Sequence, residues 1–243
     1  MRRLVGGSRW LAGVDGCRGG WFAVLGRCAT GIAFHEVRFA LCENFGQVLT
    51  LPEQPAIIAV DIPIGLLDCA CPGGRLCDRA ARKMLGPGRA TSVFSPPARA
   101  ALSASDYRNA LRLNGSGMSK QAYNITHKIR EVDQLMQPRL QRRVYEAHPE
   151  LAFCALAGEP LKHNKKTPVG QQERLELLRA HFGFLEPAVL RERFVRSLLA
   201  PDDILDAYAL ALTALRIQRR AAEKLPLAQP ECDTKGLRME IWY

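Results

Sequence analysis

Apolar runs separated by tight turns open the chain and predict three strands of an antiparallel sheet. The runs are residues 10–15, 20–25 and 32–39, and the segments between them are short and contain glycine. Connections this short join only antiparallel neighbours. A short helix is predicted at 43–51, and it leads to the uninterrupted apolar run 56–60. Because a run without polar alternation indicates burial on both faces, we expect this fourth strand to lie parallel to the first.

The middle of the chain changes character and predicts a helical insertion. Glycine and proline become frequent after Pro63, and two helices are expected at 103–113 and 119–135. We interpret 63–137 as an insertion into a single domain that spans residues 1–243, packed over one edge of the sheet. Its basic residues are expected either to face a groove or to form a hydrated surface: Arg75, Arg79, Arg82, Lys83, Arg89 and Arg99.

The last hundred residues predict a fifth strand and a set of helices. The strand is expected at 143–147, with a short helix after it. Apolar residues at a helical period predict a helix that runs through Phe182, and another is expected at 187–199. A final helix begins after Pro201, with acidic residues in its first turn, where the positive end of the helix dipole favours them. One further strand is predicted at 237–242.

The charge of the chain favours an anionic partner. Lysine and arginine number 34 against 24 aspartate and glutamate residues, which gives a formal net charge of +10. Such a balance favours nucleic acid or nucleotides as partners, and the alternative is that the basic residues form hydrated helix surfaces. Hydrophobic residues make up 47% of the 243 residues, which is enough for a sizeable core. The composition therefore predicts a soluble globular protein.

The chain shows no clear membrane or export signal. No segment reaches the roughly 18 consecutive apolar residues of a membrane span, so we expect no membrane partner. The start Met1-Arg2-Arg3 resembles the beginning of a signal peptide, but the apolar stretch behind it is short and lacks a cleavage pattern of small residues. We therefore expect a cytoplasmic protein.

Three of the eight cysteines are clustered, at Cys69, Cys71 and Cys77. Zinc sites usually show a C-x2-4-C pair and a fourth ligand, whereas this C-x-C-x5-C cluster has no histidine beside it. We therefore favour a loop without metal over a structural metal site. The remaining cysteines lie singly in apolar or turn segments, and we expect them to be reduced: Cys17, Cys28, Cys42, Cys154 and Cys232.

Acidic residues stand where predicted strands end and where the last helix begins. Asp15 follows the first strand, Asp61 follows the fourth, Glu146 lies in the fifth, and Asp203 and Asp206 open the final helix. Buried carboxylates that meet at one place need a cation to neutralise them. Each also has an ordinary interpretation, since aspartates are common in turns and in the first turn of helices. The pattern favours a carboxylate metal site assembled from distant segments.

The surroundings of these acids distinguish them from one another. Asp206 follows two apolar residues on a helix that must pack inward, so we expect it to be buried. Because side chains alternate between the two faces of a strand, either Glu146 or Glu150 reaches the site. His148 lies between them as a candidate for proton transfer, or as a hydrogen-bonding residue at the strand end.

The order of the predicted elements resembles that of the ribonuclease H-like fold. The acidic segments at Asp15, Asp61 and Asp203–Asp206 are similar to those of its Holliday-junction resolvase branch. From Leu11 to about Ile241 the chain also resembles an uncharacterised family of predicted nucleases with this fold. The resemblance rests on these segments: Val14–Trp21, Ser92–Phe94, Ser119–Ile125, Glu146–Glu150, Lys165–Gly170 and Asp202–Ala207.

The resemblance implies an α/β fold and a metal-dependent nuclease. The fold is a five-stranded mixed sheet, with three antiparallel and two parallel strands, flanked by helices. The reaction would be hydrolysis of phosphodiester bonds on two ions of Mg²⁺ or Mn²⁺, which prefer oxygen ligands. The catalytic residues would be Asp15, Asp61, Glu146, Asp203 and Asp206, with the four aspartates as metal ligands. The candidates for contacts to phosphate are Arg18, Lys120, Lys165 and Lys166.

Two other functions stay open at this level. A phosphotransferase of the actin-like and sugar-kinase type has the same strand order, but such enzymes usually duplicate the fold, and the chain contains no G-x-x-x-x-G-K-[ST] motif. A nucleic-acid-binding protein without catalytic activity would gain nothing from acids placed beside phosphates. The sequence leaves the kind of nucleic acid and the oligomeric state open, with a homodimer as one option.

Overall fold

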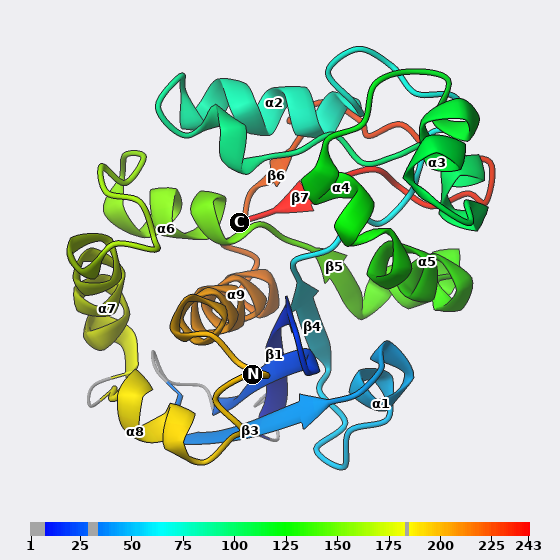
Figure 1. Ribbon diagram of the computed structural model, residues 1–243. Coiled ribbons are helices and arrows are strands. Elements are labelled where there is room, and N and C mark those ends of the chain that lie inside the picture. The colour runs from blue at the N-terminus through cyan, green and yellow to red at the C-terminus, as the bar shows by residue number, and fades with distance from the viewer. Residues whose placement is uncertain (1–7, 29–33, 183–184) are drawn as a thin grey trace. The chain divides into compact units, whose positions relative to one another are not determined.

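The computed structural model of the protein describes residues 8–28, 34–182 and 185–243. The chain divides into two compact units (Figure 1). The first unit is formed by Met1–Val60 and Lys162–Ala221, and the second by Asp61–Leu161 and Ala222–Tyr243. The insertion predicted at 63–137 falls entirely within the second unit.

The strands form a mixed sheet, which confirms the predicted α/β class. The sheet has five strands in the order β3-β2-β1-β4-β5. β1 pairs antiparallel with β2 and parallel with β4, and β2 pairs antiparallel with β3. The three-stranded meander and the parallel fourth strand are therefore confirmed. The strand bounds are β1 Arg9–Cys17, β2 Gly20–Cys28, β3 Glu36–Cys42, β4 Ile57–Val60 and β5 Val144–Glu146.

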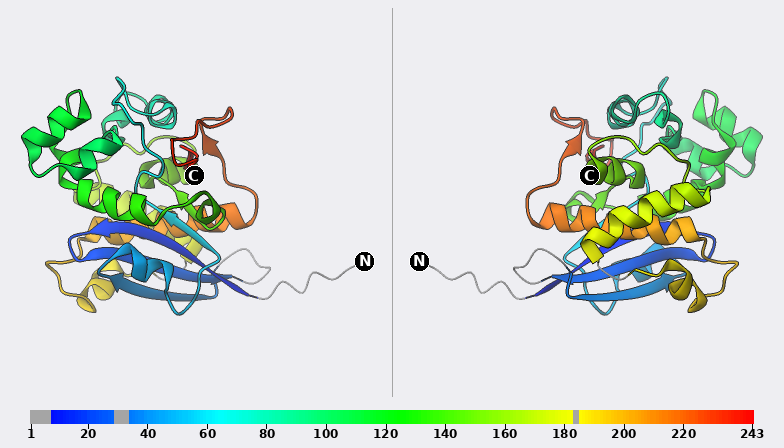
Figure 2. Two further views of the ribbon diagram at one scale, coloured as in Figure 1. Left: turned by 90° about the vertical axis from the view of Figure 1, so that its right-hand side faces the viewer. Right: turned by 90° about the vertical axis from the view of Figure 1, so that its left-hand side faces the viewer.

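Helix α9, Pro201–Gln218, packs directly on the strands of the first unit. Its residues from Ile204 to Leu215 are all buried, and Figure 2 shows the orange helix lying across the blue strands. Gly13 of β1 allows this close packing, because a Cβ atom there would lie 2.0 Å from the backbone nitrogen of Ala211. The part of α9 from Ala207 to Ala211 is thereby held close to β1. The other helices of this unit are α1 Phe45–Leu49, α7 Pro168–Phe182 and α8 Pro187–Glu192.

The second unit has its own core around helix α2, Leu76–Leu85. Buried residues of α2, including Cys77 and Leu85, pack with Leu151 and Ile241, and Figure 1 shows α2 beside β6 and β7. The remaining elements are α3 Tyr107–Asn114, α4 Lys120–Asn124, α5 Thr126–Leu135, α6 Pro149–Ala157, β6 Lys224–Leu225 and β7 Ile241–Trp242, with 3-10 turns at Ala90–Ser92, Arg99–Ser103 and Pro138–Arg142.

Several predicted boundaries differ from the structure. The third strand was expected at 32–39 but begins at Glu36, where Arg27 and Glu36 pair across the strands at 3.3 Å. Residues 29–33 and the Met1-Arg2-Arg3 start lie outside the described residues. The helix predicted at 119–135 is two helices, because the Thr126 hydroxyl donates to the Tyr123 carbonyl at 2.7 Å where the chain turns.

The helix predicted at 103–113 and the C-terminal elements are shorter than expected. A 3-10 turn ends at Ser103, and α3 begins only after Asp106, whose side chain accepts from the backbone N–H of Asn109. The helix predicted at 187–199 ends at Glu192, and the strand predicted at 237–242 covers only Ile241–Trp242. Among the described residues, no helix combines the length and hydrophobicity needed to cross a membrane.

Candidate carboxylate site

Four charged side chains of the first unit gather where β1 and the start of α9 lie together. Asp15 lies near the end of β1 and is 6% exposed, and Asp206 lies in the second turn of α9 and is fully buried. Asp202 lies one turn earlier in α9. Lys165 comes from the segment before α7, and its Nζ lies 2.5 Å from Oδ2 of Asp206 and 3.8 Å from Oδ2 of Asp202.

The electrostatics of this cluster centre on Lys165. Burial alone would lower the pKa of Lys165, but the negative charges of Asp206, Asp15 and Asp202 outweigh it and raise the pKa above its ordinary value. Lys165 is therefore a permanent cation and not a base at neutral pH. Three carboxylates and one ammonium carry a formal charge of −2 together. The side chain of Lys165 remains 35% exposed, whereas that of Asp206 is 1% exposed.

Asp203 accepts a backbone hydrogen bond, and its predicted part in metal binding stays a prediction. Its Oδ2 accepts a hydrogen bond from the backbone N–H of Ala200 at 2.9 Å, which closes the first turn of α9. An acid in this position stabilises the amino end of a helix. The geometry thus favours Asp202, with Asp206, as the pair of helix carboxylates that face Lys165.

Glu146 lies in a second cluster, within the second unit. Arg75 donates to both of its oxygens, from Nη1 to Oε2 at 2.8 Å and from Nη2 to Oε1 at 2.5 Å. The backbone N–H of Ile64 also donates to Oε2, at 2.7 Å. Arg75 also forms an ion pair with Asp78, with Nη2 of Arg75 2.7 Å from Oδ1 of Asp78. Both oxygens of Glu146 therefore have strong donors, so we leave Glu146 out of the proposed metal ligands.

The protonation of Glu146 is set by its burial. Removal from water raises the pKa of Glu146 to about 7, against the opposing effects of Arg75 and of the Ile64 N–H. Arg75 and Asp78 are 2% and 0% exposed. The arginine was expected at a groove or on a hydrated surface, and this expectation is wrong: Arg75 is a buried counterion. Its spacing to Asp78, three residues at the start of a helix, is the signal that could have indicated an ion pair.

The other residues of the second unit that were predicted to belong to the site lie beside this cluster. Asp61 and His148 line a small cavity of about 20 Å³ together with Arg75 and Glu146. A cavity of this volume holds about one water molecule. His148 caps α6, since its Nδ1 accepts from the backbone N–H of Glu150 at 3.2 Å, and Glu150 is buried in the first turn of that helix. His148 is thus a strand-end hydrogen-bonding residue.

The candidates for phosphate contacts differ in their surroundings. Arg18 is exposed in the turn between β1 and β2, and Lys166 is exposed next to Lys165. Lys120 begins α4 in the second unit, and its ammonium lies 4.5 Å from the centroid of the Tyr107 ring. The first two therefore belong to the same unit as the Lys165 cluster.

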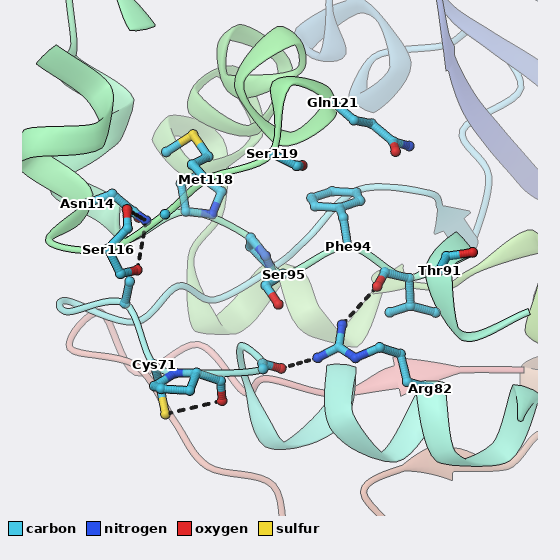
Figure 3. A pocket seen from close by; sticks show the side chains of 17 residues that line it. Cys71, Arg82, Thr91, Phe94, Ser95, Asn114, Ser116, Met118, Ser119 and Gln121 are labelled. Atoms are coloured by element: carbon cyan, nitrogen blue, oxygen red, sulfur yellow. Dashed lines mark hydrogen bonds between the residues drawn. The ribbon is translucent and has the colours of Figure 1, made fainter. Parts of the chain in front are cut away.

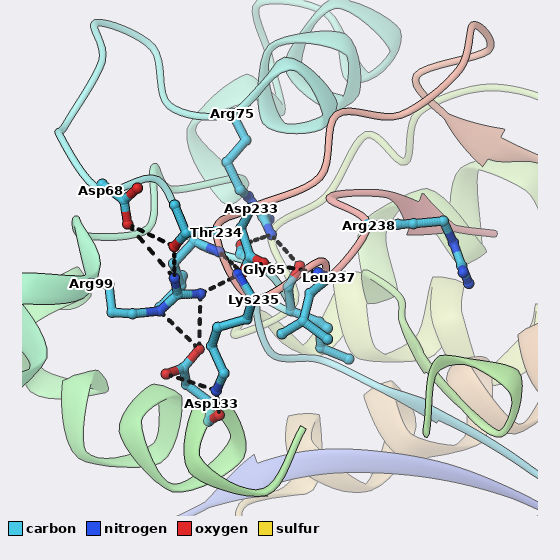
Figure 4. A network of polar contacts seen from close by, with 12 residues as sticks. Gly65, Asp68, Arg75, Arg99, Asp133, Asp233, Thr234, Lys235, Leu237 and Arg238 are labelled. Atoms are coloured by element: carbon cyan, nitrogen blue, oxygen red, sulfur yellow. Dashed lines mark hydrogen bonds and ion pairs between the residues drawn. The ribbon is translucent and has the colours of Figure 1, made fainter. Parts of the chain in front are cut away.

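Acidic residues of the second unit hold Arg99 of the predicted insertion and Lys235 of the C-terminal loop in place. Figure 4 shows Arg99 between Asp133, Asp233 and Thr234. Its Nη1 donates to the Thr234 hydroxyl at 2.8 Å, and its Nη2 lies 3.2 Å from Oδ1 of Asp133. Lys235 pairs with the same Asp133, at 3.4 Å. These side chains stabilise the C-terminal loop, so they are not simply hydrated surface groups.

The described part of the chain contains no formed metal centre. Within residues 8–28, 34–182 and 185–243, no group of three or more histidine, cysteine, aspartate or glutamate side chains is arranged to hold an ion. All eight cysteines are free thiols. Cys77 of α2 is buried in the core of the second unit, whereas Cys69 and Cys71 are exposed. Around Asp206 the positive charge comes from Lys165.

The protein is of the α/β class and contains a cluster of carboxylates around Lys165, and the comparisons assign it to a family. The chain belongs to the family described as "Protein of unknown function (DUF429)", whose model matches residues 13–231. The matched range contains Asp15, Lys165 and Asp206. The comparison with curated proteins gives no match, and neither does the comparison with solved structures. The assignments to the ribonuclease H-like fold and to nucleases stay predictions.

Proposed function

We propose that the protein is a metal-dependent nuclease that hydrolyses phosphodiester bonds of a nucleic acid. The observation that carries the proposal is the convergence of Asp15, Asp202 and Asp206 on Lys165. An acidic cluster beside phosphates hinders binding unless cations neutralise it. The +10 charge of the whole chain supports a polyanionic substrate.

The residues of this cluster fit a divalent cation by charge and by chemistry. The three carboxylates and the ammonium sum to −2, and carboxylate oxygens are the ligands that Mg²⁺ and Mn²⁺ prefer. Asp15 and Asp206 would hold the ion, with Asp202 as the third carboxylate. A bound ion of this kind lowers the pKa of its water ligand and neutralises charge that develops on the phosphate.

Binding of a divalent ion would require the side chain of Lys165 to move. Its ammonium now lies at Asp206, so a second cation near that carboxylate would repel it. Lys165 is 35% exposed and has a flexible stem, which allows the ammonium to move toward solvent and contact a phosphate of the substrate. The exposed Arg18 and Lys166 extend the positive charge of the same unit.

A cleavage assay on the full chain tests the proposal. Single-stranded, duplex and branched DNA and RNA are incubated with Mn²⁺ or Mg²⁺, or with EDTA. We expect metal-dependent cleavage that Asp206→Asn and Asp15→Asn each reduce by at least about 100-fold, the scale of losing one charged catalytic contact. Substrate affinity should also fall steeply with salt, because Lys and Arg displace counterions from the backbone.

Asp203→Asn is the matched control for these variants. It removes the same charge from the preceding turn of the same helix, yet an asparagine oxygen can still accept from Ala200, so cleavage should be retained. Cleavage that survives Asp206→Asn would contradict the proposed site, and transfer of phosphate from ATP to a small hydroxyl compound would identify a phosphotransferase instead. The predicted part of Asp61 in catalysis stays a prediction, which Asp61→Asn tests in the same panel.

A further inference from the structure

The second unit contains a pocket that the carboxylate site does not use. Its volume is about 580 Å³, within the range of small-molecule sites. Loop segments and residues of α2, α3 and α4 form it, and Figure 3 shows Phe94 in the middle of the lining side chains. The lining residues are those of 70–73, those of 114–121 except Gly115 and Lys120, Thr91, the run 93–97, and Arg82 of α2.

One wall of the pocket is fixed by hydrogen bonds from α2. Arg82 donates from Nη1 to the carbonyl of Val93 at 2.8 Å, and from Nη2 to the carbonyl of Gly73 (Figure 3). The backbone N–H of Gly74 donates to the carbonyl of Cys71 at 2.8 Å, which closes the turn. Gly73 has φ +78, in the left-handed region that favours glycine. The sequence therefore suits the conformation of this turn. The wall is therefore preformed.

The opposite wall is fixed by α3. The side-chain oxygen of Asn114 accepts from the backbone N–H of Ala98 at 2.7 Å, and its nitrogen donates to the carbonyl of Ser116 at 3.1 Å. The hydroxyl of Tyr107 donates to the carbonyl of Met118 at 2.7 Å. A ligand that enters a pocket with two fixed walls loses little affinity to the ordering of the protein.

The chemistry of the lining restricts the ligand. None of the lining residues is an aspartate, glutamate or histidine, and Arg82 carries the only formal charge. Phe94 presents an aromatic ring, while Gln121 and the nearby serines offer hydrogen-bonding groups around it. Such a lining favours a planar group that stacks on Phe94 and an anionic group attracted by Arg82. It disfavours cations.

We infer that this pocket binds a nucleotide, with the base against Phe94 and the phosphate toward Arg82. Aromatic side chains hold bases by stacking without selecting a sequence. Because Nη1 and Nη2 of Arg82 donate to backbone carbonyls, Arg82 attracts the phosphate through its charge and not through a bidentate contact. The choice of nucleotide among planar anions rests on the proposed function. The nucleotide is either free or an unpaired nucleotide of a nucleic-acid strand, and both present the same base and phosphate.

Titration of the full chain with adenosine 5′-monophosphate, adenosine and a short single-stranded oligonucleotide tests the inference. Phe94→Leu should weaken nucleotide binding at least fivefold, since stacking contributes about 1–3 kcal/mol per base. Phe94→Tyr keeps the ring and should bind within about twofold of the original protein. Gln121→Glu adds a negative charge and should weaken adenosine 5′-monophosphate more than adenosine, by about threefold to fivefold.

Gln134→Glu is the control for charge, because Gln134 is exposed on α5 and does not line the pocket. Binding of the mononucleotide identifies a free nucleotide as ligand, and Phe94-dependent binding of the oligonucleotide alone identifies a strand. If neither binds, or if Phe94→Leu leaves both affinities unchanged, the inference is overturned. Asp206→Asn separates this inference from the proposed function, since that variant should lose cleavage and keep mononucleotide binding.

Discussion

Lys165 in the first unit and Arg75 in the second each lie among carboxylates, but they are held in different ways. Arg75 is 2% exposed and donates to Glu146, to Asp78 and to the backbone carbonyls of Ile64 and Gly65. Lys165 is 35% exposed and makes one short contact, to Asp206. The arginine cluster is enclosed, whereas the lysine cluster opens to solvent.

This difference separates a structural ion cluster from one that is able to exchange its cation. The guanidinium has five donors in a rigid plane and matches two carboxylates at once, so no small ion substitutes for it. An ammonium is a point charge on a flexible stem, and a divalent ion supplies the same kind of attraction more strongly. We therefore expect substitution of Arg75 to affect folding, and substitution of Lys165 to affect metal binding.

The largest expected effect is that of Arg75→Met on stability. The substitution leaves Glu146 and Asp78 buried without their shared cation, and breaking a buried ion pair in this way costs about 3–5 kcal/mol. Urea unfolding at pH 7 measures the loss. Arg75→Lys should be almost as damaging, because a lysine cannot donate to two carboxylates in the same geometry.

Lys83→Met serves as the control for Arg75→Met, because Lys83 is an exposed residue of the same helix. It removes the same formal charge, and its free energy of unfolding should stay within about 0.5 kcal/mol of the original protein. If Arg75→Met unfolds at the same urea concentration as Lys83→Met, the arginine cluster does not stabilise the fold.

The next effect is the pH dependence that Glu146 gives to stability. Its pKa is raised from 4.5 to about 7 in the folded protein, so between these values the folded protein holds a proton that the unfolded chain has released. Stability from this group is therefore present below pH 4.5 and is lost as the pH rises toward 7. In Glu146→Gln this loss should disappear, a relative gain of about 1–3 kcal/mol between pH 5 and pH 7.5.

Urea unfolding of both proteins at several pH values measures this difference. A parallel pH dependence in the original protein and in Glu146→Gln would show that Glu146 titrates as it does in the unfolded chain. Glu240→Gln is the control, because its partners Lys224 and Arg238 outweigh burial and lower the pKa of Glu240. The contribution of Glu240 to stability is therefore constant between pH 5 and pH 7.5 and is lost only at lower pH.

The two clusters also show which features the sequence could predict. The meander and the parallel strand β4 follow from local patterns of apolar residues and from the lengths of connections, and the structure confirms them. The burial of Asp206 follows from the apolar residues before it in α9. The partner of each acid does not follow from local patterns, because Lys165 is 41 residues from Asp206 and Arg75 is 71 residues from Glu146.

Local patterns also cannot distinguish a buried basic residue from a hydrated one. Arg75 and Lys83 lie close together in the sequence, and only the packing of α2 places one inside the unit and the other at its surface. Asp202 and Asp203 present the same difficulty, since both suit the first turn of a helix. A backbone hydrogen bond favours a helix-capping role for Asp203, whereas Asp202 faces Lys165 at 3.8 Å.

The smallest effect, but the one most specific to Lys165, is expected from Lys165→Met. Removing the ammonium should tighten the binding of Mn²⁺ about tenfold or more, because unit charges about 4 Å apart repel by several kcal/mol at a partly buried site. Without metal the variant should be less stable, since Asp206 loses its cation. Added Mn²⁺ should therefore raise its Tm more than it raises the Tm of the original protein.

Lys166→Met tests whether the tighter Mn²⁺ binding comes from the loss of Lys165 itself or from the lower net charge of the chain. Both variants lower the charge of the chain by one, but Lys166 is exposed and lies one residue beyond the ammonium that contacts Asp206. Mn²⁺ affinity should change by less than about twofold in Lys166→Met, because an exposed charge is screened by solvent and salt. Equal Mn²⁺ affinities for the two variants would mean that Lys165 and the ion do not share a position, and Lys165 would then be a structural counterion, as Arg75 is.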